Sequence, residues 1–315
     1  MYVFSSLMFD IPTVPTSDEL LDKAFRRAIR ARGGKEKRSN AEEVMIRTAS
    51  NILVNNLKDI VRRFPNFEQI SDFYRETIDI IIGIDNLRIS LSSVNWASGK
   101  IHQIARSALV KIRRGQNSKI VRKQTYGRIA SIMKEINCDL DFLNTARNKI
   151  KDLPHITDEP AILVAGYPNV GKSSFVSFVT NAKPEIAQYP FTTKGIAVGH
   201  VEYLGRRYQV IDLPGLLDRP VAKRNVVERQ AISALKHLGD AVLFILDPTE
   251  TCGYPVTDQL KLLAELKLQF SIPFIVASNK ADLNPALTGL EMYQISARDG
   301  QGVSQVLKAL IRASS

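Results

Sequence analysis

The amino-acid sequence predicts an all-α helical bundle at the N-terminus, followed by an α/β domain with a mainly parallel sheet. Two observations carry this prediction: apolar residues recur at helical spacing in the first half, and short apolar runs alternate with helical segments in the second. The chain has 315 residues, 44% of them hydrophobic, which is enough for two domains. We place these domains at residues 1–156 and 157–315, with the boundary near the segment LPHITDEP.

Helix starts and stops justify the first domain. The segments TSDE (Thr16–Glu19) and SNAE (Ser39–Glu42) fit the capping box, in which a hydroxyl and a carboxylate satisfy free N–H groups at a helix start. A helical stripe follows the second box and ends at Pro65. These patterns predict about four long helices preceded by a shorter one. The later patterns cover about residues 66–84, 87–114 and 129–150.

Short apolar runs justify the sheet of the second domain. The runs are AILVAG, IAVGHVEYL, RRYQVIDL, DAVLFILD, PFIVASN and MYQIS, and helical segments separate most of them. The link YLGRRY, with Gly205, predicts a hairpin between the second and third runs.

Net charge differs between the two halves. The whole chain carries +11; residues 1–158 hold 27 basic and 18 acidic residues, and residues 159–315 hold 16 and 14. A basic half joined to a nearly neutral half favours a polyanion as the partner of the first half. The sequence has no apolar run of about 18 residues, so we expect no transmembrane helix.

The segment GYPNVGKS, Gly166–Ser173, matches the phosphate-binding loop G-x-x-x-x-G-K-[ST]. It follows a predicted strand and opens a predicted helix, so its backbone N–H groups can surround a phosphate. We expect Lys172 to bridge the β- and γ-phosphates and Ser173 to hold Mg²⁺. The predicted nucleotide-binding residues of this loop are Gly166, Tyr167, Pro168, Asn169, Val170, Gly171, Lys172, Ser173 and Ser174.

The segment NKAD, Asn279–Asp282, selects guanine over adenine. A carboxylate at Asp282 accepts hydrogen bonds from N1–H and N2–H of guanine, whereas adenine has no matching donors. Asn279 is expected at the other edge of the base, with Lys280 beside it. The backbone N–H of Ala297, after Ser296, is predicted to complete the base pocket. The expected ligands are therefore GTP and GDP.

Two segments are expected to respond to the γ-phosphate. In DLPGLLDRP, Asp212 is predicted to reach Mg²⁺ through water, and the Gly215 N–H is predicted to contact the γ-phosphate. In YPFTT, we favour Thr193 as a Mg²⁺ ligand, with Thr192 as the alternative. The residue after Gly215 is Leu216, which cannot orient water because an alkyl chain neither donates nor accepts a hydrogen bond.

The segments GYPNVGKSS, YPFTT and DLPGLLDRP resemble those of Obg-type GTPases. The segment IPTVPTSDELLDKAFRRA, Ile11–Ala28, together with the basic helical half, is similar to the nucleolar GTP-binding protein 1 family. This resemblance implies a P-loop GTPase domain. It also implies that the protein hydrolyses GTP slowly and binds rRNA during assembly of the large ribosomal subunit. It further implies a monomer acting on pre-ribosomal particles, cytoplasmic in an archaeal-type member and nucleolar in a eukaryotic one. Eukaryotic relatives carry a long C-terminal extension.

Two other functions stay open at this point. One is a GTPase of the HflX type, which also joins a helical segment to an Obg-like domain and acts on mature ribosomes. The other is a metabolic or RNA-modifying enzyme, which is disfavoured because the sequence shows no second set of active-site residues.

The family resemblance also supplies a candidate for the missing catalytic group. In some relatives with an apolar residue after the glycine, an asparagine in the phosphate loop binds K⁺, and Asn169 occupies that position. The expected catalytic set is Lys172, Asn169, Thr193 and Gly215. Alternatively, Asn169 only stabilises the loop, or the ribosomal particle supplies the group.

The basic residues of the helical half lie in one interval. No acidic residue occurs between Asp85 and Glu135, so bases there cannot pair locally. This pattern favours RNA over a merely solvated face. An anionic membrane is disfavoured because no exposed bulky apolar residues are expected; Trp96 and Tyr126 are predicted in the core. The candidate RNA-binding residues are Arg106, Lys111, Arg113, Arg114, Lys119, Arg122 and Lys123.

Overall fold

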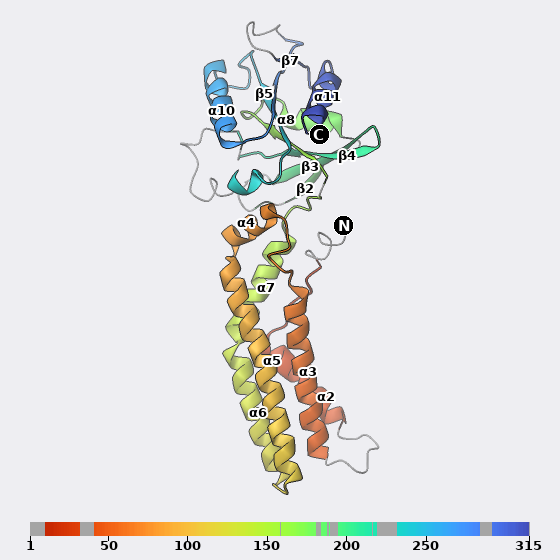
Figure 1. Cartoon of the computed structure of the whole chain (residues 1–315), viewed down its shortest axis with the longest axis vertical. Coiled ribbons are helices and arrows are strands. Elements are labelled where there is room, and N and C mark those ends of the chain that lie inside the picture. The colour runs from red at the N-terminus through yellow and green to blue at the C-terminus, as the bar shows by residue number, and fades with distance from the viewer. Residues whose placement is uncertain are drawn as a thin grey trace. The chain divides into compact units, whose positions relative to one another are not determined.

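The structure is a computed structural model that divides into two compact units (Figure 1). The first unit comprises residues 1–70 and 82–151, and the second comprises residues 71–81 and 152–315. The described residues are 10–31, 41–157, 159–180, 184–187, 189, 195–215, 217–218, 232–283 and 292–314.

The first unit is a helical bundle, as predicted. Helix α3 packs against α2 and α5, and α5 also packs against α6 and α7. None of the helices in the described ranges is long and apolar enough to cross a membrane. The bundle helices are α2 (Ser17–Ala31), α3 (Ala41–Arg63), α5 (Ile84–Arg113), α6 (Ser118–Glu135) and α7 (Asn137–Lys151).

Local hydrogen bonds set the ends of these helices. The first predicted capping box is confirmed: the Thr16 N–H donates to Glu19 Oε2 at 2.9 Å, and the Glu19 N–H donates to Thr16 Oγ1 at 3.3 Å. Ser39 of the second box lies outside the described residues. The stripe predicted over residues 129–150 is divided at Ile136, where α6 ends. Helix α7 begins at Asn137, whose side chain accepts from the Ser17 hydroxyl of α2 at 2.6 Å.

Apolar side chains from several helices form the core of the bundle. Near the turn between α5 and α6, one cluster joins residues of α3, α5 and α6. Burying an isoleucine or valine side chain in such a cluster contributes about 1.5–3 kcal/mol relative to exposure. The cluster comprises Ile46, Ala105, Ala108, Ile112 and Val121.

The second unit contains a seven-stranded sheet in the order β2-β3-β4-β1-β5-β6-β7. Strands β4, β1, β5, β6 and β7 pair in parallel, and β2, β3 and β4 pair antiparallel, which confirms the mainly parallel sheet. The strands are β1 (Ala161–Ala165), β2 (Glu185–Ala187), β3 (Ile196–Tyr203), β4 (Arg206–Asp212), β5 (Ala241–Leu246), β6 (Phe274–Ser278) and β7 (Tyr293–Gln294).

The predicted hairpin is also confirmed. Tyr203 of β3 pairs with Arg206 of β4, and the two residues between them, Leu204 and Gly205, have φ of 49° and 74°. Two left-handed residues in a two-residue loop match the right-handed twist of the flanking strands.

Helices cover both faces of the sheet. Helices α8 (Lys172–Val179) and α11 (Val303–Ala313) contact each other on one face, and α10 (Val256–Gln269) covers the other (Figure 1). Because β1, β4, β5 and β6 run parallel, their carboxyl ends meet at one edge, where ligands bind in open α/β sheets.

Helix α4 (Asp72–Ile81) belongs to the second unit, although it lies between bundle helices in the sequence. The Tyr74 hydroxyl accepts from the Ile156 N–H at 2.8 Å and donates to the Pro154 carbonyl at 2.9 Å. The Phe73 ring stacks on Tyr189, with centroids 6.2 Å apart. This grouping differs from the single predicted boundary at residue 156, since these long-range contacts do not show in local sequence patterns.

Candidate functional site

The phosphate loop connects β1 to α8 at the carboxyl edge of the sheet. Gly171 has φ of 106°, and a Cβ there would lie 2.2 Å from Asn279 Nδ2, so only glycine fits. An open pocket of about 490 Å³ lies over the loop. Its loop lining is Pro168, Asn169, Gly171, Lys172, Ser173 and Ser174.

Lys172 is buried, and its ammonium lies inside the loop. Its Nζ donates to the carbonyl oxygens of Gly166 at 2.8 Å and Tyr167 at 2.9 Å. Val170 is the loop residue that neither lines the pocket nor binds Lys172. It is buried, and its carbonyl accepts from Asn279 Nδ2 at 2.7 Å. The loop is therefore held from both sides, with its lysine at the place that a phosphate would approach.

Ser173 and Asp212 place two oxygen groups side by side. The Ser173 hydroxyl donates to Asp212 Oδ2 at 2.7 Å, and Asp212 is 1% exposed. Within the described residues, Asp212 Oδ1 is buried without a hydrogen-bond partner. Burial raises the pKa of the Asp212 carboxyl, although the Ser173 hydroxyl and the Lys172 ammonium act in the opposite direction. A hydroxyl and a carboxylate with a spare oxygen suit Mg²⁺, which prefers oxygen ligands.

The Gly215 N–H, predicted to contact the γ-phosphate, has an internal partner. It donates to Asp218 Oδ2 at 2.8 Å, and both residues line the phosphate pocket. The carboxylate of Asp218 thus binds the donor that a phosphate oxygen would use. Asp218 was not among the predicted site residues, although it lies three residues after Gly215 in DLPGLLDRP.

The base-recognition segments contact each other through Asn279. Its Oδ1 accepts from the Ala297 N–H at 2.9 Å, while its Nδ2 donates to Val170. Both groups were predicted to face the base; in the structure they join three loops, and their contact with a base stays a prediction. Ser296 is fully buried and its hydroxyl donates to Asp299 at 3.1 Å. Asp282 is exposed, in agreement with a role in binding a ligand.

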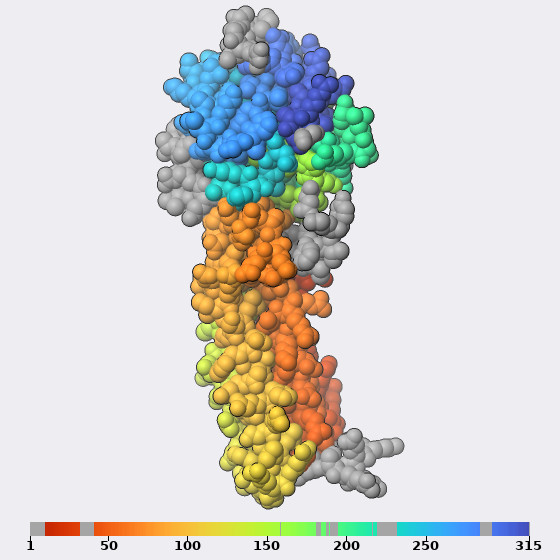
Figure 2. Space-filling model, in the orientation of Figure 1, coloured from red at the N-terminus to blue at the C-terminus, as the bar shows by residue number. Residues whose placement is uncertain are grey.

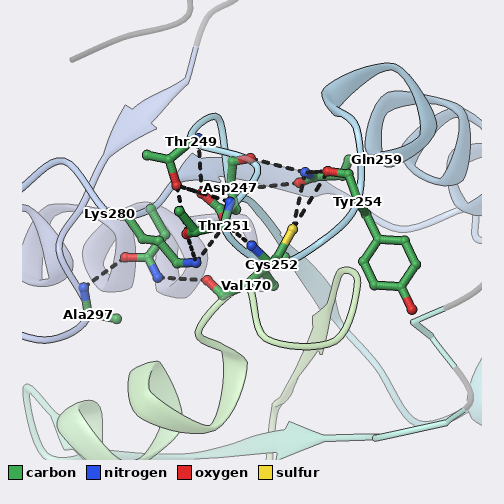
Figure 3. A network of polar contacts seen from close by, with 10 residues as sticks. Val170, Asp247, Thr249, Thr251, Cys252, Tyr254, Gln259, Lys280 and Ala297 are labelled. Atoms are coloured by element: carbon green, nitrogen blue, oxygen red, sulfur yellow. Dashed lines mark hydrogen bonds and ion pairs between the residues drawn. The ribbon is translucent and has the colours of Figure 1, made fainter. Parts of the chain in front are cut away.

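The Lys280 side chain joins a buried polar network around Asp247 (Figure 3). Its Nζ lies 2.6 Å from Asp247 Oδ2 and 2.6 Å from the Thr251 hydroxyl. Asp247 follows β5 in the segment DPTETCGYP, which sequence analysis treated only as the end of a strand. An acidic residue at the carboxyl end of a parallel strand was a usable signal for this edge of the sheet.

Three predicted residues lie outside the described part of the chain: Thr192, Thr193 and Leu216. The roles assigned to them, Mg²⁺ binding and the absence of a water-orienting group, stay predictions.

The basic residues of α5 and α6 fall into two classes. Six of the seven RNA-binding candidates are exposed and have no carboxylate partner among the described residues. The seventh, Arg122, pairs with the buried carboxylate of Glu42 and lies over the Tyr126 ring at 5.4 Å. Arg122 therefore stabilises the bundle internally. The six exposed candidates are Arg106, Lys111, Arg113, Arg114, Lys119 and Lys123.

Most of these bases lie in the turn between α5 and α6 or in the helix turns beside it, at the end of the bundle that is yellow in Figure 2. Bulky apolar side chains are exposed on the same two helices: Trp96 is 47% exposed and Ile120 is 56% exposed. The prediction that Trp96 lies in the core is therefore wrong, because position 96 falls outside the buried stripe of α5. The expectation that these faces lack exposed bulky apolar residues, which disfavoured an anionic membrane, is also wrong.

Two family models match the chain. The one described as the NOG1 N-terminal helical domain matches residues 9–157, and the one described as nucleolar GTP-binding protein 1 (NOG1) matches residues 226–282. Among solved structures, one of a Plasmodium falciparum protein of the same family name is 31% identical, with a TM-score of 0.45. It covers 51% of this chain and 90% of that one.

Curated relatives match most of the chain. A Methanocaldococcus jannaschii protein without an assigned function is 38% identical, over 87% of this chain and 80% of that protein. Nucleolar GTP-binding protein 1 of Eremothecium gossypii is 36% identical, over 87% and 44%. The Arabidopsis thaliana protein of that name is 37% identical, over 82% and 39%. The chain thus spans less than half the length of these two eukaryotic relatives. Both family models match in order along one chain, and the archaeal relative is covered over most of its length, so the chain belongs to the nucleolar GTP-binding protein 1 family.

Proposed function

We propose that this chain binds GTP and GDP and hydrolyses GTP slowly, as a switch in the assembly of the large ribosomal subunit. One observation carries the nucleotide proposal: Asn279 joins the phosphate loop, the NKAD segment and the Ala297 loop at one edge of the sheet. This arrangement supports simultaneous recognition of phosphates and base. The name of the family, nucleolar GTP-binding protein 1, agrees with it.

Phosphate binding is assigned to Lys172, the loop N–H groups and the Gly215 N–H. Ser173 and Asp212 would hold Mg²⁺, which supplies positive charge to the phosphate oxygens when bound. The Gly215 N–H can stabilise charge that develops on the γ-phosphate once Asp218 has released it. Asn169 is exposed in the phosphate pocket, and we further assign K⁺ binding to its side chain.

RNA binding is assigned to the α5–α6 end of the bundle. Six exposed bases without carboxylate partners among the described residues give this surface the unneutralised charge that phosphate backbones require. Large-subunit rRNA in a pre-ribosomal particle is the proposed partner, in the nucleolus of a eukaryote or the cytoplasm of an archaeon.

Filter binding to large-subunit rRNA over a salt series tests this assignment. Changing Arg113, Arg114, Lys119 and Lys123 to glutamate should weaken binding at least tenfold and flatten the dependence on salt. Nucleotide affinity should stay unchanged. Binding to anionic vesicles instead of rRNA, or a flat salt response of the wild type, would contradict RNA binding.

A second candidate function is action on mature ribosomes, as in the HflX type. Co-sedimentation from cells separates the two: association with assembly intermediates supports the assembly role, and association with finished ribosomes supports the alternative.

A further inference from the structure

Asp247 is a buried carboxylate outside every segment assigned to nucleotide binding. It lies directly after β5 and is fully buried. Its Oδ1 accepts from the Thr249 N–H at 3.0 Å and the Thr249 hydroxyl at 2.5 Å. Its Oδ2 accepts from the Cys252 N–H at 2.7 Å, the Thr251 hydroxyl at 3.2 Å and the Lys280 ammonium at 2.6 Å. Such a fully satisfied carboxylate has one fixed position.

The other end of this ion pair, Lys280, lies inside the NKAD segment. Leu246 of β5 pairs with Ser278 of β6, so Asp247 and Lys280 emerge from adjacent strands. The Asn279 N–H donates to the Leu246 carbonyl at 2.8 Å, which extends the pairing by one residue. The Lys280 side chain is 20% exposed, and its ammonium donates to Asp247 and Thr251.

Gln259 of α10 fixes the backbone of Asp247 from the other side (Figure 3). Its Oε1 accepts from the Asp247 N–H at 2.8 Å, and its Nε2 donates to the Asp247 carbonyl at 3.0 Å. The Nε2 also donates to the Tyr254 carbonyl at 2.9 Å, and the Tyr254 ring lies 4.3 Å from that of Tyr167 in the phosphate loop. The position of Asp247 is therefore set by elements that also contact the phosphate loop.

Electrostatics keeps this carboxylate charged. Burial alone would raise its pKa, but hydrogen bonds from Lys280, Thr249 and the Cys252 N–H hold the pKa at about 2. At neutral pH Asp247 is thus a full negative partner for the Lys280 ammonium.

The competing partner for that ammonium is Asp282, two residues further along the same loop. Asp282 is exposed, and within the described residues it has neither an ion pair nor a hydrogen bond through its side chain. A long, flexible lysine released so close to a carboxylate would pair with it. That pairing would occupy the oxygens that read the purine N–H groups.

We propose that Asp247 is a positioning residue for guanine recognition: it binds the Lys280 ammonium, which leaves the Asp282 carboxylate free to accept hydrogen bonds from the base. This inference rests on the proposed function, in which Asp282 reads guanine.

Dissociation constants of GDP, IDP and ADP for the full chain test the proposal. IDP lacks the 2-amino group, so the ratio of IDP to GDP constants measures reading by Asp282. Asp247→Asn should lower this ratio about tenfold, the value of one hydrogen bond to a charged group. In a Lys280→Met background, Asp247→Asn should have no further effect on the ratio, because the ammonium is already absent. Glu202→Gln, an exposed charge removal on β3, is the control and should leave the ratio unchanged.

Thr249→Val separates positioning from stability. It removes the hydroxyl that binds Asp247 Oδ1 and the Thr251 hydroxyl, but it leaves both direct contacts of the Lys280 ammonium, so it should lower the melting temperature while largely keeping the IDP-to-GDP ratio. If Asp247→Asn does not fold, Thr251→Val, which loses a contact to both Asp247 and Lys280, should lower the ratio by a smaller factor.

Three results would overturn the inference: an unchanged ratio in Asp247→Asn, an equal drop in the Lys280→Met background, or, where Asp247→Asn does not fold, an unchanged ratio in Thr251→Val. A wild-type chain that binds GDP no better than ADP would refute the proposed function itself, so the two failures are distinguishable.

Discussion

The two units treat charged side chains in opposite ways. In the nucleotide-binding unit, Lys172, Asp212 and Asp247 are buried and each has hydrogen-bond partners at fixed distances. In the bundle, six of the seven predicted RNA-binding bases are exposed and have no carboxylate partner among the described residues. Buried charges need exact partners because desolvation is costly, whereas exposed charges act through their density.

This difference between paired buried charges and unpaired exposed charges determines what each unit can recognise. Fixed donors and acceptors can distinguish one base or one phosphate from another. A field of exposed cations attracts any polyanion and depends on salt. We therefore expect single substitutions to have large effects in the second unit and small effects in the bundle, where Arg122 is the exception.

The largest expected effect is on Lys172. Lys172→Ala removes the buried ammonium from the phosphate loop, so GTP affinity should fall about 100-fold, since hydrogen bonds to charged groups contribute about 1.5–3 kcal/mol each. Fluorescent-nucleotide titration measures this. Lys236→Ala, an exposed lysine of the same unit, should change nothing. A loss below about threefold would contradict the assignment of Lys172.

The next largest effect is expected on the stability of the bundle, at Arg122. Arg122→Gln leaves the Glu42 carboxylate, 6% exposed, without its cation, and should lower the free energy of unfolding by about 2–3 kcal/mol. Arg113→Gln, at an exposed base, should change it by less than about 0.5 kcal/mol. Urea denaturation followed by helical circular dichroism measures both. Equal destabilisation by the two variants would remove the distinction between structural and RNA-binding bases.

A smaller effect is expected at Asp218. Its carboxylate binds the Gly215 N–H, so a γ-phosphate must displace it and meets its negative charge. Asp218→Asn should therefore tighten binding of a non-hydrolysable GTP analogue relative to GDP, by about fivefold. Competition titration of the two nucleotides checks this. An unchanged preference would show that Asp218 does not compete for this donor.

The smallest effect is expected at Asn169. Its φ of 64° is left-handed, so Asn169→Gly keeps the backbone conformation and removes only the amide. If Asn169 binds K⁺, the wild type should hydrolyse GTP a few-fold faster in K⁺ than in Na⁺, and Asn169→Gly should remove the difference. Single-turnover rates in the two salts measure it. Equal rates for the wild type would leave Asn169 with a role in loop conformation alone.

Local patterns predicted most of the elements. The capping box at Thr16, the hairpin at Gly205 and the phosphate loop each depend on neighbours within a few residues, and the structure confirms the first two directly. Sequence analysis missed the break at Ile136, the exposure of Trp96 and the grouping of α4 with the second unit. The grouping of α4 depends on contacts with residues far along the chain, whereas Trp96 simply lies outside the buried stripe of α5.

The sequence by itself determined the fold class and the place of the phosphate loop, and it predicted the choice of guanine, because those features rest on residue types at fixed spacing. Only the tertiary structure decided which charged groups are already in use. Asp247 and Lys280 are 33 residues apart, and Glu42 and Arg122 are 80 apart. The partners of these side chains are set by strand pairing and helix packing, which no local spacing encodes.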